Sequence, residues 1–245
     1  MGPRMTAART LLPALVVLLT ASGCGGPATG FITRTYKGAG GQKARYALFV
    51  PHDYSPQRPA PVILFLHGGG EAGTDGWKPT QVGIGPAIRA REQTFPFLVV
   101  FPQAQLSAVW LPGQAEGNRA MAILDEVRKE YRTDPKRVYL TGVSMGGFGV
   151  WQFSTAFPKR WAAIVPICGL DHPAKVEVVK DIPCWCFHGE QDGVVPVQTS
   201  RDMVDVLRKA GGQPRYTEYP GVGHNSWDAA YATDELYDWL LQQHR

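Results

Sequence analysis

The sequence predicts an α/β fold with a mostly parallel central sheet and helices on both of its faces. Short continuous apolar runs recur along the chain, and such runs are typical of parallel strands that are buried on both faces. Segments of helical periodicity separate these runs, and strands that alternate with helices indicate right-handed crossover connections. The 245 residues are enough for one sizeable domain, and no internal repeat indicates a solenoid or a propeller.

The first residues have the composition of an export signal. Arg4 and Arg9 give a positive start, and the apolar run 11–21 is too short to span a bilayer. The small residues after this run end at Cys24, in the tetrapeptide Ala-Ser-Gly-Cys, which resembles a bacterial lipobox with alanine where leucine is more usual. We therefore expect residues 1–23 to be a signal peptide of the lipoprotein type.

The same pattern predicts where the protein is located. A lipidated Cys24 would anchor the chain at the envelope of a bacterial cell, with residues 24–30 as a tether and residues 31–245 as the folded domain. The alternative is simple secretion to the periplasm or the medium, in which Cys24 has no role. Contact with a membrane is expected only through the lipid anchor.

The composition excludes several classes of protein. Hydrophobic residues make up 44% and charged residues 19%, as in an ordinary globular domain. Loss of residues 1–23 would lower the formal net charge from +4 to +2. No basic run is interleaved with aromatic residues, so nucleic acid is not an expected partner. No segment has the spacing of metal ligands, and we expect neither a metal nor an organic cofactor.

The domain is expected to open with two antiparallel strands around a glycine-rich turn, followed by buried parallel strands and four helices. The strands are predicted at 31–37, 44–50, 62–66, 97–101, 138–140, 162–167, 184–187 and 215–219. The helices are predicted at 118–131, 146–157, 198–209 and 234–242. No linker interrupts the domain, and no large insertion after residue 167 predicts a cap, so an open cleft is expected.

Three further cysteines lie in apolar runs, at Cys168, Cys184 and Cys186. Cys184 and Cys186 are two apart on a predicted strand, so they share one face and Trp185 lies on the other. We expect all three to be small buried core residues. An exported protein can also oxidise a pair of cysteines, and a disulfide from Cys168 to either of the other two stays open.

Ser144 is the candidate nucleophile. It stands in Gly142-Val143-Ser144-Met145-Gly146, which follows a predicted strand and begins a predicted helix. A sharp strand-to-helix turn pushes the serine hydroxyl out of the carboxyl edge of the sheet, and a Cβ at Gly142 or Gly146 would crowd the neighbouring backbone. The helix N-terminus adds partial positive charge and free N–H groups that can receive an oxyanion.

A second glycine-rich segment supplies further N–H groups. His67-Gly68-Gly69-Gly70 directly follows the strand 62–66, and bare glycines let the backbone approach a substrate closely. We expect one oxyanion donor from Gly69 or Gly70 and the other from Met145. His67 is expected to brace this loop.

A serine nucleophile needs a base and an acid that orients the base. His224, in the loop after the last predicted strand, is the expected base, whereas His188 ends a buried strand and is expected to pack there. Asp192, in the turn after the strand 184–187, is the expected acid. Glu190 and Asp171 are the alternatives, and Asp192 could also serve only to cap a helix.

With these motifs in view, residues 31–245 resemble the catalytic domain of the α/β-hydrolase superfamily, in which nucleophile, acid and base follow in this order along the chain. More narrowly, the chain resembles single-domain bacterial esterases of the polyhydroxybutyrate-depolymerase-like, feruloyl-esterase-like and prolyl-oligopeptidase-like groups. The segments that carry the resemblance are LFLHGGGEAG (64–73), DPKRVYLTGVSMGGFGVW (134–151), FHGEQDGVVPV (187–197) and YPGVGHNSWDAAY (219–231).

The resemblance implies an α/β-hydrolase fold and a serine esterase that cleaves carboxylic esters through an acyl-enzyme. Some members of the superfamily carry cysteine or aspartate as nucleophile, and the serine here favours ester hydrolysis over dehalogenation or dienelactone opening. An open cleft suits an ester that is part of a bulky molecule, such as a polysaccharide side group, an aryl ester or a polyester, so the expected partner is an ester substrate, which can be polymer-linked.

Three residues near these motifs are candidates for contact with the substrate. Trp110 and Trp227 would give the acyl pocket aromatic walls, or they are packing residues. Glu71 either braces the glycine loop or touches the substrate. A serine peptidase or an acyltransferase with the same triad stays open as an alternative, as does a lipid-anchored binding protein with an inactive triad.

Overall fold

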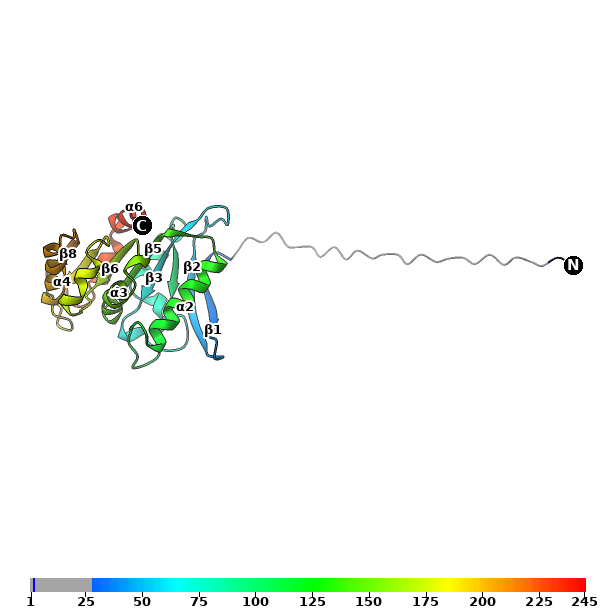
Figure 1. Ribbon diagram of the computed structural model, residues 1–245, viewed down its shortest axis with the longest axis horizontal. Helices are drawn as coiled ribbons and strands as arrows, with labels where there is room; N and C mark the ends of the chain where they lie inside the picture. The colour runs from blue at the N-terminus through cyan, green and yellow to red at the C-terminus, as the bar shows by residue number, and fades with distance from the viewer. Residues whose placement is uncertain (1, 3–27) are drawn as a thin grey trace.

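The computed structural model describes residue 2 and residues 28–245. Its strands are β1 (Gly30–Lys37), β2 (Lys43–Val50), β3 (Ala60–Leu66), β4 (Leu98–Phe101), β5 (Thr133–Val143), β6 (Ala163–Ile167), β7 (Trp185–Gly189) and β8 (Arg215–Tyr219). They form one sheet in the order β1-β2-β4-β3-β5-β6-β7-β8 (Figure 1). β2 pairs antiparallel with β1 and β4, and all other neighbours are parallel. The predicted mostly parallel sheet is confirmed.

Six α-helices flank this sheet in the described part of the chain. They are α1 (Ile84–Ala90), α2 (Ala115–Glu130), α3 (Met145–Ala156), α4 (Gln198–Lys209), α5 (Trp227–Ala232) and α6 (Asp234–Gln242). The four predicted helices correspond to α2, α3, α4 and α6. The two short helices α1 and α5 were not predicted. Gly85 and Pro86 obscure α1 in the sequence, although proline is tolerated in the first turn of a helix.

The helices bury two apolar clusters, one on each face of the sheet. Side chains of α2, α3 and α4 pack on one face, where Leu124, Val150 and Met203 are almost fully buried. Side chains of α1, α5 and α6 pack on the other, where Ile88 and Leu240 are buried. In Figure 1, α2 and α3 lie in front of the sheet and α6 lies at its other side. The predicted helices on both faces are confirmed.

The three core cysteines are buried and free, so the structure contains no disulfide among them. Cys184 and Cys186 belong to one apolar cluster and Trp185 to the other, as their alternation predicts. Burial raises the pKa of the Cys186 thiol to about 12, with a smaller opposing effect of its hydrogen bond to Ser200. The prediction of small core residues is confirmed.

The segment between β6 and β7 contains only a 3-10 helix, Pro173–Val179, so no large cap covers the carboxyl edge of the sheet there, as predicted. None of the described helices is long and apolar enough to cross a membrane. The expected signal peptide, the lipidation site Cys24 and most of the tether lie outside the described residues.

Close packing at the start of α3 requires glycine. A Cβ on Gly146 would lie 1.9 Å from the carbonyl oxygen of Leu66, and one on Gly142 would lie 2.6 Å from the carbonyl oxygen of Gly146. The crowding that the sequence predicted at these two positions is confirmed.

The variant Gly146→Ala should therefore lower the free energy of unfolding by about 3 kcal/mol, because neighbouring main chain must move to admit the methyl group. Urea denaturation measures this loss. The matched control is Gly193→Ala, since a Cβ at Gly193 has nothing within 4 Å. Its effect should stay within about 0.5 kcal/mol, and equal stabilities of the two variants would contradict the argument.

Candidate active site

Ser144 stands on the turn between β5 and α3, in a backbone conformation that non-glycine residues rarely adopt. Its φ is 54° and its ψ is −117°, and its N–H donates to the carbonyl oxygen of Ile167 over 3.0 Å. Residues held in such regions carry about 1–3 kcal/mol of strain. Because Gly142 and Gly146 pack against the main chain on either side, the fold fixes this conformation and directs the hydroxyl out of the sheet.

The structure brings the three predicted triad residues together, although they lie in the loops after three different strands. The Ser144 hydroxyl lies 2.9 Å from Nε2 of His224, and Nδ1 of His224 lies 2.7 Å from Oδ2 of Asp192. Since a carboxylate can only accept, Nδ1 carries the proton and the Nε2 lone pair faces the hydroxyl. This is the tautomer that a general base for Ser144 requires.

Asp192 uses its two oxygens for two separate tasks. Oδ1 accepts the N–H groups of Val194 and Val195 at 2.8 and 2.9 Å, whereas Oδ2 faces His224. Burial raises the pKa of Asp192, but the hydrogen bonds from His224, Val195 and Val194 more than offset it, so this pKa lies below its usual value. The carboxylate therefore stays ionised, holding the turn with one oxygen and the imidazole with the other.

The alternative acids are engaged elsewhere. The Glu190 carboxylate accepts the N–H of Gly221 over 2.9 Å, which ties the β7 turn to the loop that carries His224. The Asp171 carboxylate accepts the side-chain amide of Gln152 and the N–H of His172. Neither contacts the imidazole of His224, so the geometry selects Asp192 among the three candidates.

A contact that sequence reasoning missed joins His188 to the triad. His188 is fully buried, as expected of a packing residue, yet its Nε2 lies 3.1 Å from Oδ2 of Asp192 and 2.9 Å from the carbonyl oxygen of Val195. Its Nδ1 lies 2.7 Å from the hydroxyl of Ser200. Nε2 faces two acceptors and must carry the proton, so Ser200 donates to Nδ1. Burial is the main cause of a lowered pKa, and this imidazole is a neutral donor behind the Asp192 carboxylate.

The glycine loop lies beside the nucleophile. A Cβ on Gly68 would lie 3.6 Å from Cβ of Ser144, so the loop begins next to the serine. Gly69 and Gly70 open the 3-10 helix Gly69–Glu71 and are exposed, and Met145 is the first residue of α3. The first N–H groups of a helix lack intrahelical partners. Gly69, Gly70 and Met145 are thus placed where oxyanion donors are expected, and that role stays a prediction.

Two buried side chains brace the glycine loop. Nδ1 of His67 donates to the carbonyl oxygen of Gly68 over 2.6 Å, and its Nε2 accepts the N–H of Ala104 over 3.0 Å. Burial lowers the pKa of His67 to about 4, so it is neutral near pH 7. The bracing role predicted for His67 is confirmed.

Glu71 also braces the loop, one of the two roles considered for it. Burial raises the pKa of its carboxyl group, and hydrogen bonds from the N–H groups of Gly68 and of Glu71 itself partly oppose this shift. Its main-chain carbonyl accepts the side-chain amide of Gln103 over 2.9 Å.

The two tryptophans proposed for the acyl pocket have different surroundings. Trp110 is fully buried, and its Nε1 donates to the carbonyl oxygen of His67 over 2.9 Å. It is a packing residue under the glycine loop, so its prediction as a pocket wall was wrong. Trp227 is half-buried, and its ring stands edge-on to the His224 imidazole with centroids 5.3 Å apart. Trp227 therefore remains a candidate for contact with an acyl group.

One group in the described part of the chain has the donor atoms of a metal site. The ligand atoms of Cys168, Asp192 and His224 lie within 4.8 Å of one another. Two of these residues are held in the triad hydrogen bonds, and burial raises the pKa of the Cys168 thiol to about 12. A protonated thiol is a poor metal ligand, so the group fits the triad better than a metal.

A comparison with known families places this site. The model of the dienelactone hydrolase family matches residues 103–233, a stretch that contains Ser144, Asp192 and His224. The chain belongs to this family. A solved thermostable esterase is 36% identical, with a TM-score of 0.81 over 88% of this chain and 63% of that one. The predicted α/β-hydrolase fold is confirmed.

Two relatives found by sequence comparison are named for ester substrates. The bifunctional acetylxylan esterase/xylanase XynS20E of Neocallimastix patriciarum is 26% identical over 66% of this chain and 23% of the relative. Feruloyl esterase D of Neurospora crassa is 26% identical over 90% of this chain and 79% of the relative. The chain thus spans less than a quarter of the first relative and most of the second.

The strain at Ser144 gives a stability prediction. The free energy of unfolding of Ser144→Gly should be about 1 kcal/mol higher than that of Ser144→Ala. Alanine keeps a Cβ in the strained conformation and glycine does not. Both variants lack the hydroxyl, so their comparison isolates the backbone effect. Urea titration of the two proteins measures the difference, and an alanine variant as stable as the glycine variant would show that the turn is not strained.

His67 should make the fold sensitive to acid. The unfolded chain protonates this imidazole near its ordinary pKa of 6.5, whereas the folded chain does so only near 4. Between these values the unfolded state binds more protons, so stability falls as the pH drops through this window, by about 3 kcal/mol in total.

The variant His67→Gln should flatten the fall in stability between pH 6.5 and pH 4. At pH 8 the imidazole of His67 is neutral in both the folded and the unfolded parent protein. The difference in free energy of unfolding between variant and parent at this pH therefore gives the cost of the substitution itself. Parallel pH curves for the variant and the parent protein would exclude His67 as the source.

Proposed function

We propose that this protein is a serine esterase that hydrolyses carboxylic esters through an acyl-enzyme. The observation that carries the proposal is the pair of hydrogen bonds from Ser144 to His224 at 2.9 Å and from His224 to Asp192 at 2.7 Å. The serine hydroxyl needs such a base near neutral pH. Exposed glycines beside the hydroxyl complete the requirements for acyl transfer.

The reaction follows from the geometry. Oγ of Ser144 forms a bond to the ester carbonyl carbon while its proton passes to Nε2 of His224. The ionised Asp192 stabilises the imidazolium, and the N–H of Met145 with that of Gly69 or Gly70 binds the oxyanion. One such donor is worth about 3 kcal/mol in the transition state. The intermediate then expels the alcohol, which takes the proton from Nε2.

Water completes the cycle by the same route. It attacks the acyl carbon while His224 accepts a proton, and the second tetrahedral intermediate breaks its bond to Oγ of Ser144, which regains the proton. No redox change occurs, and the net reaction consumes one water for each ester bond. The neutral His188 behind Asp192 keeps the carboxylate oriented through both half-reactions.

Three observations support a substrate that is an aryl or acetyl ester on a polysaccharide. The two relatives described above are an acetylxylan esterase/xylanase and a feruloyl esterase. The segment between β6 and β7 leaves the site uncapped, which suits a polymer chain. The half-buried ring of Trp227 beside His224 gives an apolar surface for an aromatic acyl group. The expected export signal, with Cys24 as anchor, would place the enzyme where such polymers occur.

The variant Ser144→Ala tests the mechanism. Its kcat/KM for methyl ferulate and for p-nitrophenyl acetate should fall by at least about 10⁴-fold, because no other group can form the acyl-enzyme. A fluorophosphonate should add one equivalent to the parent protein at Ser144 and none to the variant, as read by intact mass.

A substrate panel separates the esterase from its alternatives. The parent protein should cleave methyl ferulate and acetylated xylan and leave a proline-containing peptide intact. Cleavage of the peptide alone would indicate a peptidase. Retained ester turnover in Ser144→Ala would mean that the nucleophile is another residue.

A further inference from the structure

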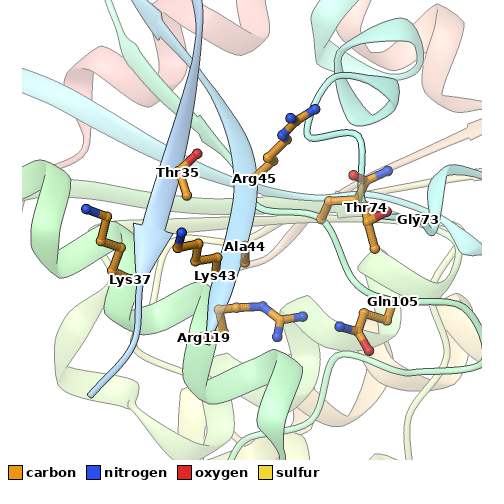
Figure 2. Close-up of a pocket in the computed structure, with 10 residues that line it drawn as sticks. Thr35, Lys37, Lys43, Ala44, Arg45, Gly73, Thr74, Gln105 and Arg119 are labelled. Carbon is orange, nitrogen blue, oxygen red and sulfur yellow. The ribbon is translucent and has the colours of Figure 1, made fainter. Parts of the chain in front are cut away.

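A pocket beside β2 lies next to the glycine loop but shares none of its lining residues with the triad. Its volume is about 450 Å³, and β1, β2, α2 and the loops after β3 and β4 enclose it (Figure 2). The pocket exists because β2 pairs with β4 only through Ala47–Phe49, so its first half, Lys43–Tyr46, has no neighbour on that side. We call it the basic pocket.

Cationic side chains line the basic pocket, and within residues 28–245 most of them have no anionic partner. Lys37, Lys43, Arg45 and Arg119 line it, and none of its described lining residues is acidic. In residues 28–245 no ion pair involves Lys37, Lys43 or Arg45, whereas Arg119 contacts Glu116 one turn away on α2. Three positive charges are therefore left uncompensated around one hollow.

The strand register makes this arrangement costly for the free protein. Lys37 stands directly opposite Lys43 in the β1–β2 ladder, and Thr35 stands opposite Arg45. All four share one face of the hairpin, since alternate residues of a strand point the same way. Like charges directly opposite one another destabilise a sheet, so folding alone does not account for them. A bound anion would remove the repulsion.

Arg45 and Arg119 give the pocket two guanidinium groups, which can only donate. In Figure 2 the side chains of Arg45 and Arg119 extend from β2 and α2 in different directions, Arg119 toward Gln105, whereas Lys37 and Lys43 point away from Thr74 and Gln105. A guanidinium group pairs with a carboxylate through two parallel hydrogen bonds. Because Arg119 is already paired with Glu116, Arg45 would hold the anion, and the lysines at the rim would raise the positive potential around it.

Asp75 follows the lining residue Thr74 in sequence, but its carboxylate does not compete for the guanidinium donors. Oδ2 of Asp75 accepts the Gln103 amide over 3.0 Å, and its Oδ1 accepts the N–H groups of Trp77 and Lys78 at 2.7 and 2.6 Å. These bonds direct Asp75 into its own loop. Gly76 lies so close to β2 that a Cβ on it would be 2.4 Å from Cβ of Arg45, which fixes the wall of the pocket.

The same loop connects the basic pocket to the proposed oxyanion donors. Gly73 lines the pocket and its N–H donates to the carbonyl oxygen of Ala104 over 2.8 Å, while the N–H of Ala104 donates to His67. Gly73 is three residues after Gly70, and three residues of extended chain span at most about 11 Å. A polymer whose ester group reaches Ser144 can therefore place a neighbouring unit in the pocket.

We propose that the basic pocket binds the carboxylate of a uronic acid in the polysaccharide whose ester is cleaved at Ser144. The inference rests on the proposed esterase function and specifies its substrate class. A uronic acid supplies a carboxylate that the unpaired Arg45 guanidinium matches and hydroxyl groups that Thr35, Thr74 and Gln105 can bind. The enzyme would then select acidic, ester-bearing polysaccharides over neutral ones.

Binding can be measured without turnover. In the Ser144→Ala protein, a xylo-oligosaccharide that carries glucuronic acid should bind at least about tenfold more tightly than the unsubstituted oligosaccharide of equal length, by isothermal titration calorimetry. The difference should shrink as salt is added. The further variant Arg45→Gln should remove most of it.

The matched control is Arg208→Gln, which removes one positive charge from an exposed position on α4. This variant should keep the full preference for the acidic oligosaccharide. Equal affinities of Ser144→Ala for the acidic and neutral oligosaccharides would overturn the inference, as would an equal loss in Arg208→Gln and Arg45→Gln.

Kinetics separate this inference from the proposed function. In the parent protein, the ratio of kcat/KM for acetylated glucuronoxylan to that for neutral acetylated xylan should fall about tenfold on Arg45→Gln. Turnover of methyl ferulate without any preference between the two xylans would leave the esterase standing and overturn the basic pocket. Preferential binding of the acidic oligosaccharide with no turnover of any ester would support the basic pocket and contradict the proposed esterase function.

Discussion

The whole site depends on the close approach of the Gly142–Gly146 turn to the end of β3. The main chain of Leu66 lies so near Gly146 that a Cβ there would be 1.9 Å from its carbonyl oxygen. Because β3 and β5 are neighbours in the sheet, this contact sets the nucleophile turn directly beside the glycine loop. The strained φ of Ser144 persists since the surrounding backbone leaves it no relaxed alternative. The hydroxyl and the expected oxyanion donors are therefore positioned by main-chain packing, before any side chain of the triad contributes.

The base and the acid reach the same edge of the sheet through a second pair of neighbouring strands. Asp192 follows β7 and His224 follows β8, and the two turns are joined by main chain as well as by the triad. The N–H of Gln191 donates to the carbonyl oxygen of Val222 over 2.9 Å. A Cβ on Gly189 would lie 2.2 Å from the carbonyl oxygen of Gly223. The His224 loop thus rests on the end of β7, and the imidazole needs little reorganisation to act on Ser144.

Sequence reasoning located the parts of this site that depend on local pattern. The glycines around Ser144, the apolar strand runs and the order of serine, aspartate and histidine each stand in a continuous segment. The parts it missed depend on which surfaces meet in space. The contact of His188 with Asp192 requires the β7 turn to fold back on its own strand. Trp110 packs inward, where its indole N–H donates to the carbonyl oxygen of His67. The cations of the basic pocket come from β1, β2 and α2, so no single stretch of sequence carries the signal.

A general explanation accounts for one of those cations but not for the others. Exposed lysines on edge strands prevent sheets from pairing with other chains, and β1 is an edge of this sheet, so Lys37 serves that purpose. Arg45 lies on the part of β2 that has no β4 partner, but the loop at Gly76 packs against its main chain there, and Arg119 lies on a helix. Edge protection requires neither of them. Their guanidinium groups are brought to one hollow by elements that pack for independent reasons, the β1–β2 hairpin and α2. The small net charge of the chain hides this local concentration, and a carboxylate bound at Arg45 would balance part of it.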